Sequence, residues 1–230
     1  MYPMYGYYDS TIFLVLIGSA IVMFAQYKVQ STFNRYNQLD SRSGMTGKEV
    51  ARRILDTVGL HDVVVEQFAG NLTDHYDPRN KILRLSQATY NVSSIAAIAV
   101  AAHETGHAIQ DKEGYAFLRF RSLIAPVVQI GSSLAVPMML LGLLLNIFSL
   151  VNLGILAFGL VLFFQIITLP VEFNASSRAI AIIDNQQIIT DEEKPAAKKV
   201  LNAAAFTYIA ATLNSALTLL RFILMSRRRN

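Results

Sequence analysis

Long apolar runs and one polar block divide the chain. The apolar runs are rich in Leu, Ile, Val, Ala and Phe, and they cover Ser10–Tyr27, Leu123–Leu145, Leu153–Leu169 and Ala203–Met225. A helix of about 20 apolar residues crosses the hydrocarbon core of a bilayer, so the pattern predicts about four membrane helices. The second and third runs are joined by a short connection and form a hairpin, which returns the chain to the side that it left. Polar residues interrupt the fourth run, which either spans the membrane or lies partly in the interface.

The polar block, residues 28–122, carries signals for a small lobe of helices and strands. Thr46 and Glu49 form a capping-box pattern, which opens a helix. Val63–Val65 predicts a short strand, and the alternation of polar and apolar residues in Lys81–Leu85 predicts another. Together, the runs and the block predict a mainly α membrane bundle with a small α+β lobe.

A further helix of the lobe carries the candidate chemistry. Ile95–Gln110 is rich in Ala and Ile, lacks proline and follows two serines that can cap a helix. Residues four apart lie on one face of a helix, so His103 and His107 can direct two imidazoles at one metal ion. Glu104 completes an H-E-x-x-H arrangement, in which it can act as general base toward a metal-bound water. The alternative is an ordinary surface helix, but uncompensated polar groups at the end of so apolar a helix would be costly.

A third ligand is needed if a catalytic zinc site is to keep its fourth position for water. Glu172 follows the third apolar run directly, and the hairpin places it on the same side of the membrane as His103 and His107. It is therefore the predicted third ligand. The alternative is that Glu172 pairs with Arg178 at a membrane surface, and the competing candidate ligands are Asp74, His75, Asp77 and Asp184.

Composition supports a multi-pass membrane protein with one polar lobe. Of the 230 residues, 53% are hydrophobic and 16% are charged, and the mean hydropathy is +0.39. The chain contains no cysteine, which excludes disulfides and thiolate zinc ligands. The net charge of +4 fits basic residues beside a bilayer better than a nucleic-acid surface.

Basic residues also predict the orientation in the cell membrane. The positive-inside rule puts the catalytic side in the cytoplasm, because that side carries Lys28, Arg35, Arg42, Lys112, Arg119, Arg121, Arg178, Lys198 and Lys199. Arg227–Arg229 oppose this orientation if the fourth run crosses the membrane fully. The predicted segments are a first membrane helix (1–27), a catalytic lobe (28–122), a membrane hairpin (123–169), a third-ligand helix and loop (170–202), and a last apolar helix with a basic tail (203–230).

The sequence resembles the YugP-type membrane zinc metallopeptidases over essentially its whole length. The matching blocks are the first apolar run, GNLTDHYDPRNKILRLS (70–86), AAHETGHAIQ (101–110) and LPVEFNASSRA (169–179). More distantly, it is similar to the HtpX and CAAX-prenyl-protease group of integral-membrane gluzincins, whose third zinc ligand is the Glu of an E-F-x-A-D-like segment. Glu172-Phe-Asn-Ala matches that segment, whereas Ser176 stands where the group carries Asp.

The resemblance implies a membrane-embedded zinc endopeptidase with one Zn²⁺ per chain, a surrounding lipid bilayer, and a peptide or membrane protein as substrate. The Asp of that group orients a ligand histidine, so Ser176 implies that this support is weaker or supplied elsewhere. The group binds substrate along the strand before its catalytic helix, which implies that role for Lys81, Ile82, Leu83, Arg84 and Leu85. Candidate donors to the reaction's oxyanion are His75, Tyr76 and Arg178.

Other functions remain as alternatives. A zinc-binding membrane scaffold or chaperone without turnover would have no use for an acidic residue in the place of Glu104. A small transporter or channel subunit is disfavoured because the few ionisable residues of the apolar runs lie near their ends. No nucleic-acid partner is expected, and the sequence leaves the oligomeric state open.

Overall fold

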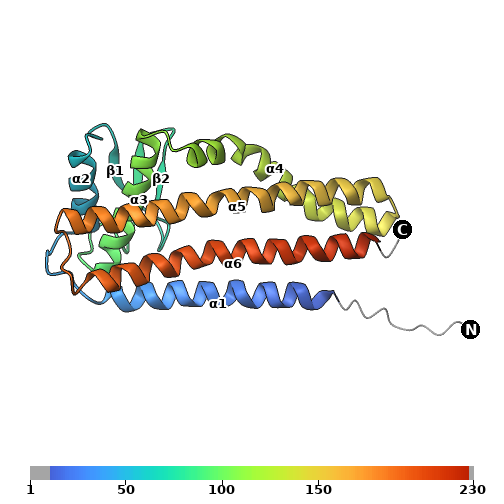
Figure 1. Cartoon of the computed structure of the whole chain (residues 1–230), viewed down its shortest axis with the longest axis horizontal. Helices are drawn as coiled ribbons and strands as arrows, with labels where there is room; N and C mark the ends of the chain where they lie inside the picture. Colours follow the sequence, from blue (N-terminus) through green and yellow to red (C-terminus); the bar gives the residue numbers. More distant parts are fainter. Residues whose placement is uncertain (1–10, 228–230) are drawn as a thin grey trace, which may run out of the picture. The chain divides into compact units, whose positions relative to one another are not determined.

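Helices dominate the chain, as the sequence predicts (Figure 1). The computed structural model describes residues 11–227, in which a small three-stranded sheet accompanies the helices. The elements in chain order are α1 (Ile12–Asn37), α2 (Gly47–Thr57), β1 (Val64–Phe68), β2 (His75–Asp77), β3 (Ile82–Ser86), α3 (Ile95–Lys112), α4 (Ala116–Leu145), α5 (Phe148–Asn185) and α6 (Lys194–Arg227). Ser10 and the last two arginines of the basic tail, Arg228 and Arg229, lie outside the described residues.

Each predicted apolar run lies in one long helix. α1, α4, α5 and α6 are 26, 30, 38 and 34 residues long, and all four are long and apolar enough to cross a membrane. α4 contains two prolines, Pro126 and Pro137, within the helix. α5 continues from its apolar run through Glu172 to Asn185, so the candidate third ligand belongs to the same helix as the membrane segment before it.

The chain forms two compact units, and the long helices contribute to both. One unit comprises the described residues 11–24, 124–166 and 209–227, and the other comprises residues 25–123 and 167–208. The second unit holds the sheet, α2, α3 and every residue discussed below as part of a site.

Small residues pack the hairpin of the first unit. A Cβ atom on Gly154 of α5 would lie 2.9 Å from the carbonyl oxygen of Ala135 on α4, so the two backbones approach closely there. Ala135, Met139 and Phe222 form a buried cluster in this unit. The turn between the two helices contains Asn146, whose φ of +56° is a left-handed conformation that Asn tolerates.

The second unit is built on the sheet and on α2. β1 pairs in parallel with β3, β2 pairs antiparallel with β3, and the side chains of Leu83 and Leu85 on β3 are fully buried in the core. α2 begins with the predicted capping box. The Thr46 hydroxyl accepts a hydrogen bond from the Glu49 amide at 3.3 Å, and the Glu49 carboxylate accepts one from the Thr46 amide at 2.8 Å.

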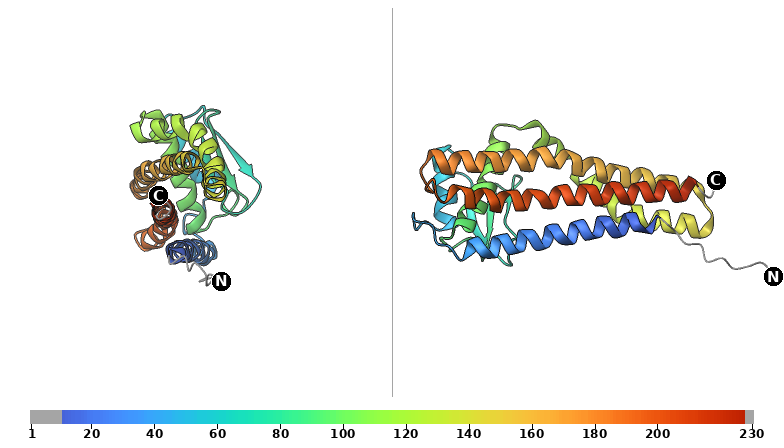
Figure 2. Two further views of the ribbon diagram at one scale, coloured as in Figure 1. Left: turned by 90° about the vertical axis from the view of Figure 1, so that its right-hand side faces the viewer. Right: turned by 60° about the horizontal axis from the view of Figure 1, so that its bottom comes forward.

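The position of β3 in the sheet corrects one prediction. Residues Lys81–Leu85 were expected to offer an open edge to a substrate, but the strand order is β1-β3-β2, so β3 is the central strand. Alternation of polar and apolar residues predicts a strand without telling where in a sheet it lies. The open edges belong to β1 and β2. His75 is the first residue of β2, and β2 contacts α3. Figure 2 shows the strands and α3 from two further directions.

Close packing holds α3 against α5. Ser94 caps α3, because its hydroxyl accepts a hydrogen bond from the Ala97 amide at 3.0 Å. Most of α3 is buried, and Gly106 lies where a Cβ atom would be only 2.7 Å from the carbonyl oxygen of Ala175 on α5. The absence of a side chain at Gly106 therefore lets the two helices approach closely enough to share a site.

Candidate metal centre

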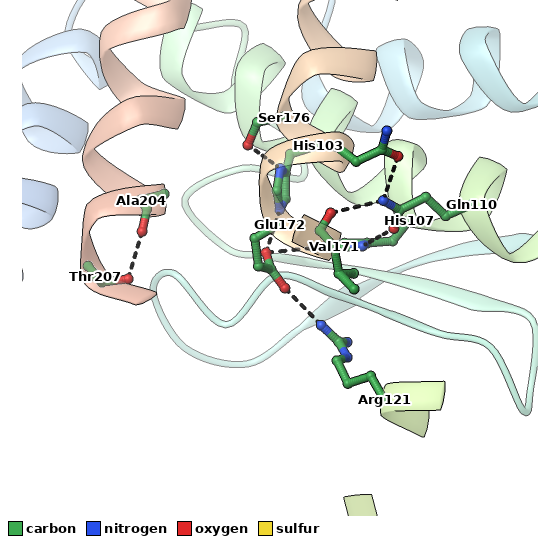
Figure 3. A network of polar contacts seen from close by, with 10 residues as sticks. His103, His107, Gln110, Arg121, Val171, Glu172, Ser176, Ala204 and Thr207 are labelled. Atoms are coloured by element: carbon green, nitrogen blue, oxygen red, sulfur yellow. Dashed lines mark hydrogen bonds and ion pairs between the residues drawn. The ribbon is translucent and has the colours of Figure 1, made fainter. Parts of the chain in front are cut away.

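Two helices of the second unit bring three potential metal ligands together. His103 and His107 of α3 point toward Glu172 of α5 (Figure 3). The distance from Glu172 Oε2 is 3.3 Å to His103 Nε2 and 3.5 Å to His107 Nε2, and the three side chains are only 12%, 10% and 4% exposed. Their ligand atoms all lie within 4.8 Å of one another, so the group could hold a metal ion.

The other candidate ligands do not belong to this group. Within residues 11–227, no other set of three or more His, Asp or Glu side chains brings its ligand atoms so close together. Asp74, His75, Asp77 and Asp184 therefore stay outside it. The alternative pairing of Glu172 with Arg178 does not occur either, because Arg178 pairs with Glu113 at 2.7 Å.

A hydrogen-bond network behind His107 determines which ring nitrogen carries the proton. Arg178 Nε donates to Asn174 Oδ1 at 2.7 Å, so the oxygen of the Asn174 amide must face this network. Gln110 Nε2 donates to the same oxygen and to the Val171 carbonyl, each at 2.9 Å. Gln110 Oε1 must then accept a hydrogen bond from the N–H of His107 Nδ1, which lies 3.0 Å away. The lone pair of His107 is therefore on Nε2, the nitrogen that faces Glu172.

The two remaining ligand side chains also have partners on the side away from the centre. The Ser176 hydroxyl lies 3.1 Å from His103 Nδ1, so it provides a hydrogen bond at the position where the gluzincin group carries Asp. Arg121 Nη1 donates to Glu172 Oε1 at 2.8 Å and leaves Glu172 Oε2 directed at the two histidines. The three inward atoms thus face one another, where a shared metal ion could bind.

Glu104 is buried beside this group. Its side chain belongs to a residue that is only 7% exposed, and burial raises its pKa to about 7. This value includes a contribution to the rise from the neighbouring carboxylates of Asp74 and Glu172, whereas His103 and Arg121 oppose the rise. A carboxyl group with such a pKa can both take and return a proton near neutral pH.

A cavity of about 240 Å³ opens onto Glu104 and His103. Its walls are mostly apolar, with Val29, Val100 and Leu201 among the lining residues. We call it the catalytic cavity. The side chains of Glu104 and His103 are therefore both accessible from this cavity.

The polar lining of the catalytic cavity includes Asp74 and Tyr208. Asp74 Oδ1 accepts the Ser86 amide at 2.7 Å, which anchors the segment before β2 to the end of β3. The phenol of Tyr208 interacts with the carboxylate of Glu172. A polar donor therefore lies near the candidate metal ligands.

The three predicted oxyanion donors lie elsewhere. None of them lines the catalytic cavity, and each has other partners. His75 Nδ1 lies 2.8 Å from the carbonyl oxygen of Thr73, and the Tyr76 hydroxyl donates to Asp111 at 3.0 Å. Burial and this hydrogen bond raise the pKa of Tyr76 above its ordinary value. Arg178 belongs to the network behind His107. The positions of these three residues in the sequence, near β3 or near Glu172, did not predict their hydrogen-bond partners.

Four polar residues of the site were not among the predicted site residues: Gln110, Arg121, Asn174 and Tyr208. Gln110 could have been found, because it follows His107 by three positions and therefore shares its helix face. Asn174 and Arg121 depend on how α3, α4 and α5 pack, which no local pattern reveals. Tyr208 lies on α6, within a run that reads as a membrane segment.

Comparisons with known proteins agree with this chemistry. A family described as "Putative neutral zinc metallopeptidase" matches residues 11–227. The chain is also 50% identical over 214 residues to the protein named "Putative membrane protease YugP" of Bacillus subtilis (strain 168), and the match covers 93% of this chain and 95% of that protein. No solved structure matches the chain. Since the family match covers nearly the whole chain, the chain belongs to the family described as "Putative neutral zinc metallopeptidase".

Proposed function

We propose that this protein is a membrane-embedded zinc endopeptidase that holds one Zn²⁺ through His103, His107 and Glu172. The observation that carries the proposal is the arrangement of these three ligands. Each side chain has a hydrogen-bond partner on its outer side and directs one atom inward, beside the buried Glu104. Two imidazole nitrogens and one carboxylate oxygen are the donor set of many catalytic zinc sites. A zinc ion bound there supplies a Lewis acid and lowers the pKa of a coordinated water.

Glu104 serves as the general base in this mechanism. Its carboxylate removes a proton from the water that attacks the peptide carbonyl, and it then delivers that proton to the leaving amine. Its burial supports this role, since a base with a pKa near 7 exchanges protons readily at neutral pH. Glu104 is next to His103 in the chain and is not one of the three ligands.

Tyr208 replaces the earlier candidates for oxyanion stabilisation. Its phenol lines the catalytic cavity and interacts with Glu172, and it can turn its single O–H donor from Glu172 to the oxygen of the peptide carbonyl as negative charge develops there. Arg121 has a different task. It pairs with Glu172 Oε1 and leaves Oε2 as the single oxygen directed at the metal position.

The substrate is a peptide or a membrane protein in an extended conformation. Leu72 and Asp74 line the catalytic cavity, and the chain continues from them into β2, an edge strand of the sheet. An extended peptide can pair with the open edge of such a strand. This proposal moves the substrate-binding edge from the central strand β3 to β2.

The location of the chemistry follows from the charges flanking the long helices. The protein contains four helices that can cross a membrane, and its relative is named as a membrane protease. We place the catalytic side in the cytoplasm, because the basic residues beside the apolar runs gather on that side. A protease-accessibility assay on intact and permeabilised cells, using a tag in the α2–β1 connection, tests this orientation.

The first prediction separates metal binding from hydrolysis. In detergent, Glu104→Gln should keep zinc but lose cleavage of a casein-like or membrane-protein substrate by a factor of at least about 100, the usual contribution of a general base. Glu172→Ala should lose both zinc and cleavage. Zinc content is measured by elemental analysis, and cleavage by the appearance of peptide fragments.

Two outcomes would contradict the proposal. Near wild-type cleavage by Glu104→Gln would remove the general base from the mechanism. Stoichiometric zinc in the wild type with no cleavage of any membrane-protein substrate tested would favour the alternative function, a zinc-binding membrane scaffold or chaperone.

A further inference from the structure

A second cavity of the same unit is lined by basic and hydroxyl side chains. It has a volume of about 490 Å³, and residues of α1 and α6 form its walls. Three cations, Lys28, Arg35 and Lys199, line it together with the hydroxyl groups of Ser31, Thr32 and Tyr36. No acidic residue is among its lining residues. The cavity, which we call the basic cavity, is therefore suited to an anion.

The three cations of the basic cavity have no anionic partner among the described residues. Within residues 11–227, none of them forms an ion pair with a carboxylate. Lys28 instead lies 5.1 Å from the ring centre of Phe206, and Arg35 lies 5.7 Å from that of Tyr36. These cation–π contacts position the side chains and leave their positive charge uncompensated.

The basic cavity lies where both helices change from polar to apolar sequence. In α1 the first apolar run ends at Tyr27, and Lys28 begins the polar part. In α6 the polar beginning ends at Asn202, and Ala203 opens the fourth apolar run. Lys28, Asn202 and Ala203, which mark these changes, line the basic cavity. Membrane helices change from apolar to polar sequence at the bilayer surface, which is also the depth of lipid phosphates.

We propose that the basic cavity binds the phosphate group of an anionic phospholipid. The cations of α1 and α6 neutralise its charge from two sides, and the hydroxyl group of Thr32 donates a hydrogen bond. Such a lipid links α1 to α6 beside the catalytic cavity, because Val29 and Leu201 of the same two helices line that cavity. The proposal is independent of peptide hydrolysis and concerns a site outside the metal centre.

A lipid-binding experiment on the full chain tests the proposal. The protein, purified in a neutral detergent, is mixed with phosphatidylglycerol or with phosphatidylcholine of the same acyl chains, and bound lipids are counted by native mass spectrometry. Phosphatidylglycerol should bind more tightly. Replacing Lys28, Arg35 or Lys199 with Gln should weaken its binding by about fivefold for each charge removed, the effect expected of one basic residue at an anionic headgroup.

Lys198→Gln is the matched control, because Lys198 is an exposed neighbour on the same helix that does not line the basic cavity. This variant should bind phosphatidylglycerol as the wild type does. Equal weakening in Lys198→Gln would reveal diffuse attraction and overturn the site, and so would equal binding of the two lipids. Inorganic phosphate distinguishes the source of the anion: if millimolar phosphate displaces phosphatidylglycerol completely, the basic cavity is a site for free phosphate and the lipid proposal is wrong.

Thermal unfolding and zinc content of each variant exclude misfolding as the cause of weaker binding. A variant that keeps its zinc and its unfolding temperature without added lipid, but loses the stabilisation by phosphatidylglycerol, supports the proposal. Cleavage by the wild type without any phosphatidylglycerol binding would leave the proposed peptidase intact and reject only the lipid site.

Discussion

Each candidate metal ligand has a partner on its outer side, and this arrangement decides the chemistry of the inner side. The chain of contacts begins at Arg178, which can only donate hydrogen bonds, and passes through Asn174 and Gln110 to His107. The donor before it in this series fixes the orientation of each side-chain amide, first Asn174 and then Gln110. The neutral imidazole of His107 therefore has its lone pair on Nε2. Glu172 is oriented by Arg121 in the same way.

Replacing Gln110 with Ala should therefore weaken zinc binding without removing any ligand. Loss of such a supporting contact typically costs 10- to 100-fold in metal affinity, and we expect a zinc dissociation constant about that much higher, measured by competition with a chelating dye. Gln67→Ala, at an exposed position of β1, is the control and should leave the affinity unchanged. An unchanged affinity in Gln110→Ala would show that the amide does not orient His107.

The packing of α3 against α5 decides whether the ligands meet at all. His103 and His107 come from one helix and Glu172 from the other, and their backbones approach closely at Gly106. α3 is also rich in alanine, and its buried face can lie close to its neighbours. The absence of a side chain at Gly106 therefore allows the close separation of these helices.

Gly106→Ala should force the two helices apart. The added Cβ would lie 2.7 Å from the Ala175 carbonyl oxygen, closer than such contacts are found, and the cost of overpacking is about 1–3 kcal/mol. We expect a lower unfolding temperature and weaker zinc binding. Gly159→Ala is the control within α5, because nothing lies within 4 Å of its added Cβ. That variant should be neutral or slightly stabilising, since Ala favours a helix over Gly. Equal behaviour of the two variants would contradict this account of the packing.

At the scale of the whole molecule, local sequence patterns predicted many features of the structure. The remaining features depend on long-range packing and could not be predicted. Hydrophobic runs predicted the four long helices, since apolar length is a property of each segment by itself. The spacing of His103 and His107 predicted a shared face, and the return of the hairpin predicted the approach of Glu172, which the structure brings to both. The order of strands and the partners Arg121 and Tyr208 could not be predicted, because they depend on which elements pack together.

Contacts between distant parts of the chain also predict a pH dependence of stability. Glu193, just before α6, accepts hydrogen bonds from the Thr190 amide at 2.7 Å and from the Arg42 amide at 2.8 Å, so it joins the beginning of α6 to the segment before α2. Burial favours a higher pKa, but these hydrogen bonds outweigh it and hold the pKa of Glu193 below its ordinary value. A carboxyl group whose pKa is lower in the folded state stabilises the protein above its unfolded-state pKa. This stabilisation is lost as the pH falls through the folded-state pKa.

Glu193→Gln should therefore destabilise the protein at pH 7 but not in acid. Hydrogen bonds to a charged group contribute about 1.5–3 kcal/mol, and we expect a loss of that order in the free energy of unfolding, measured in detergent with a chemical denaturant. The difference between wild type and variant should shrink as the pH is lowered, because the wild-type carboxylate then becomes protonated. Glu192→Gln is the matched control: its carboxylate pairs with Arg42 at 2.5 Å, but both side chains are largely exposed, so its loss should cost less than about 1 kcal/mol. A difference for Glu193→Gln that stays constant down to strongly acidic pH would show that its charge is not what joins the two segments.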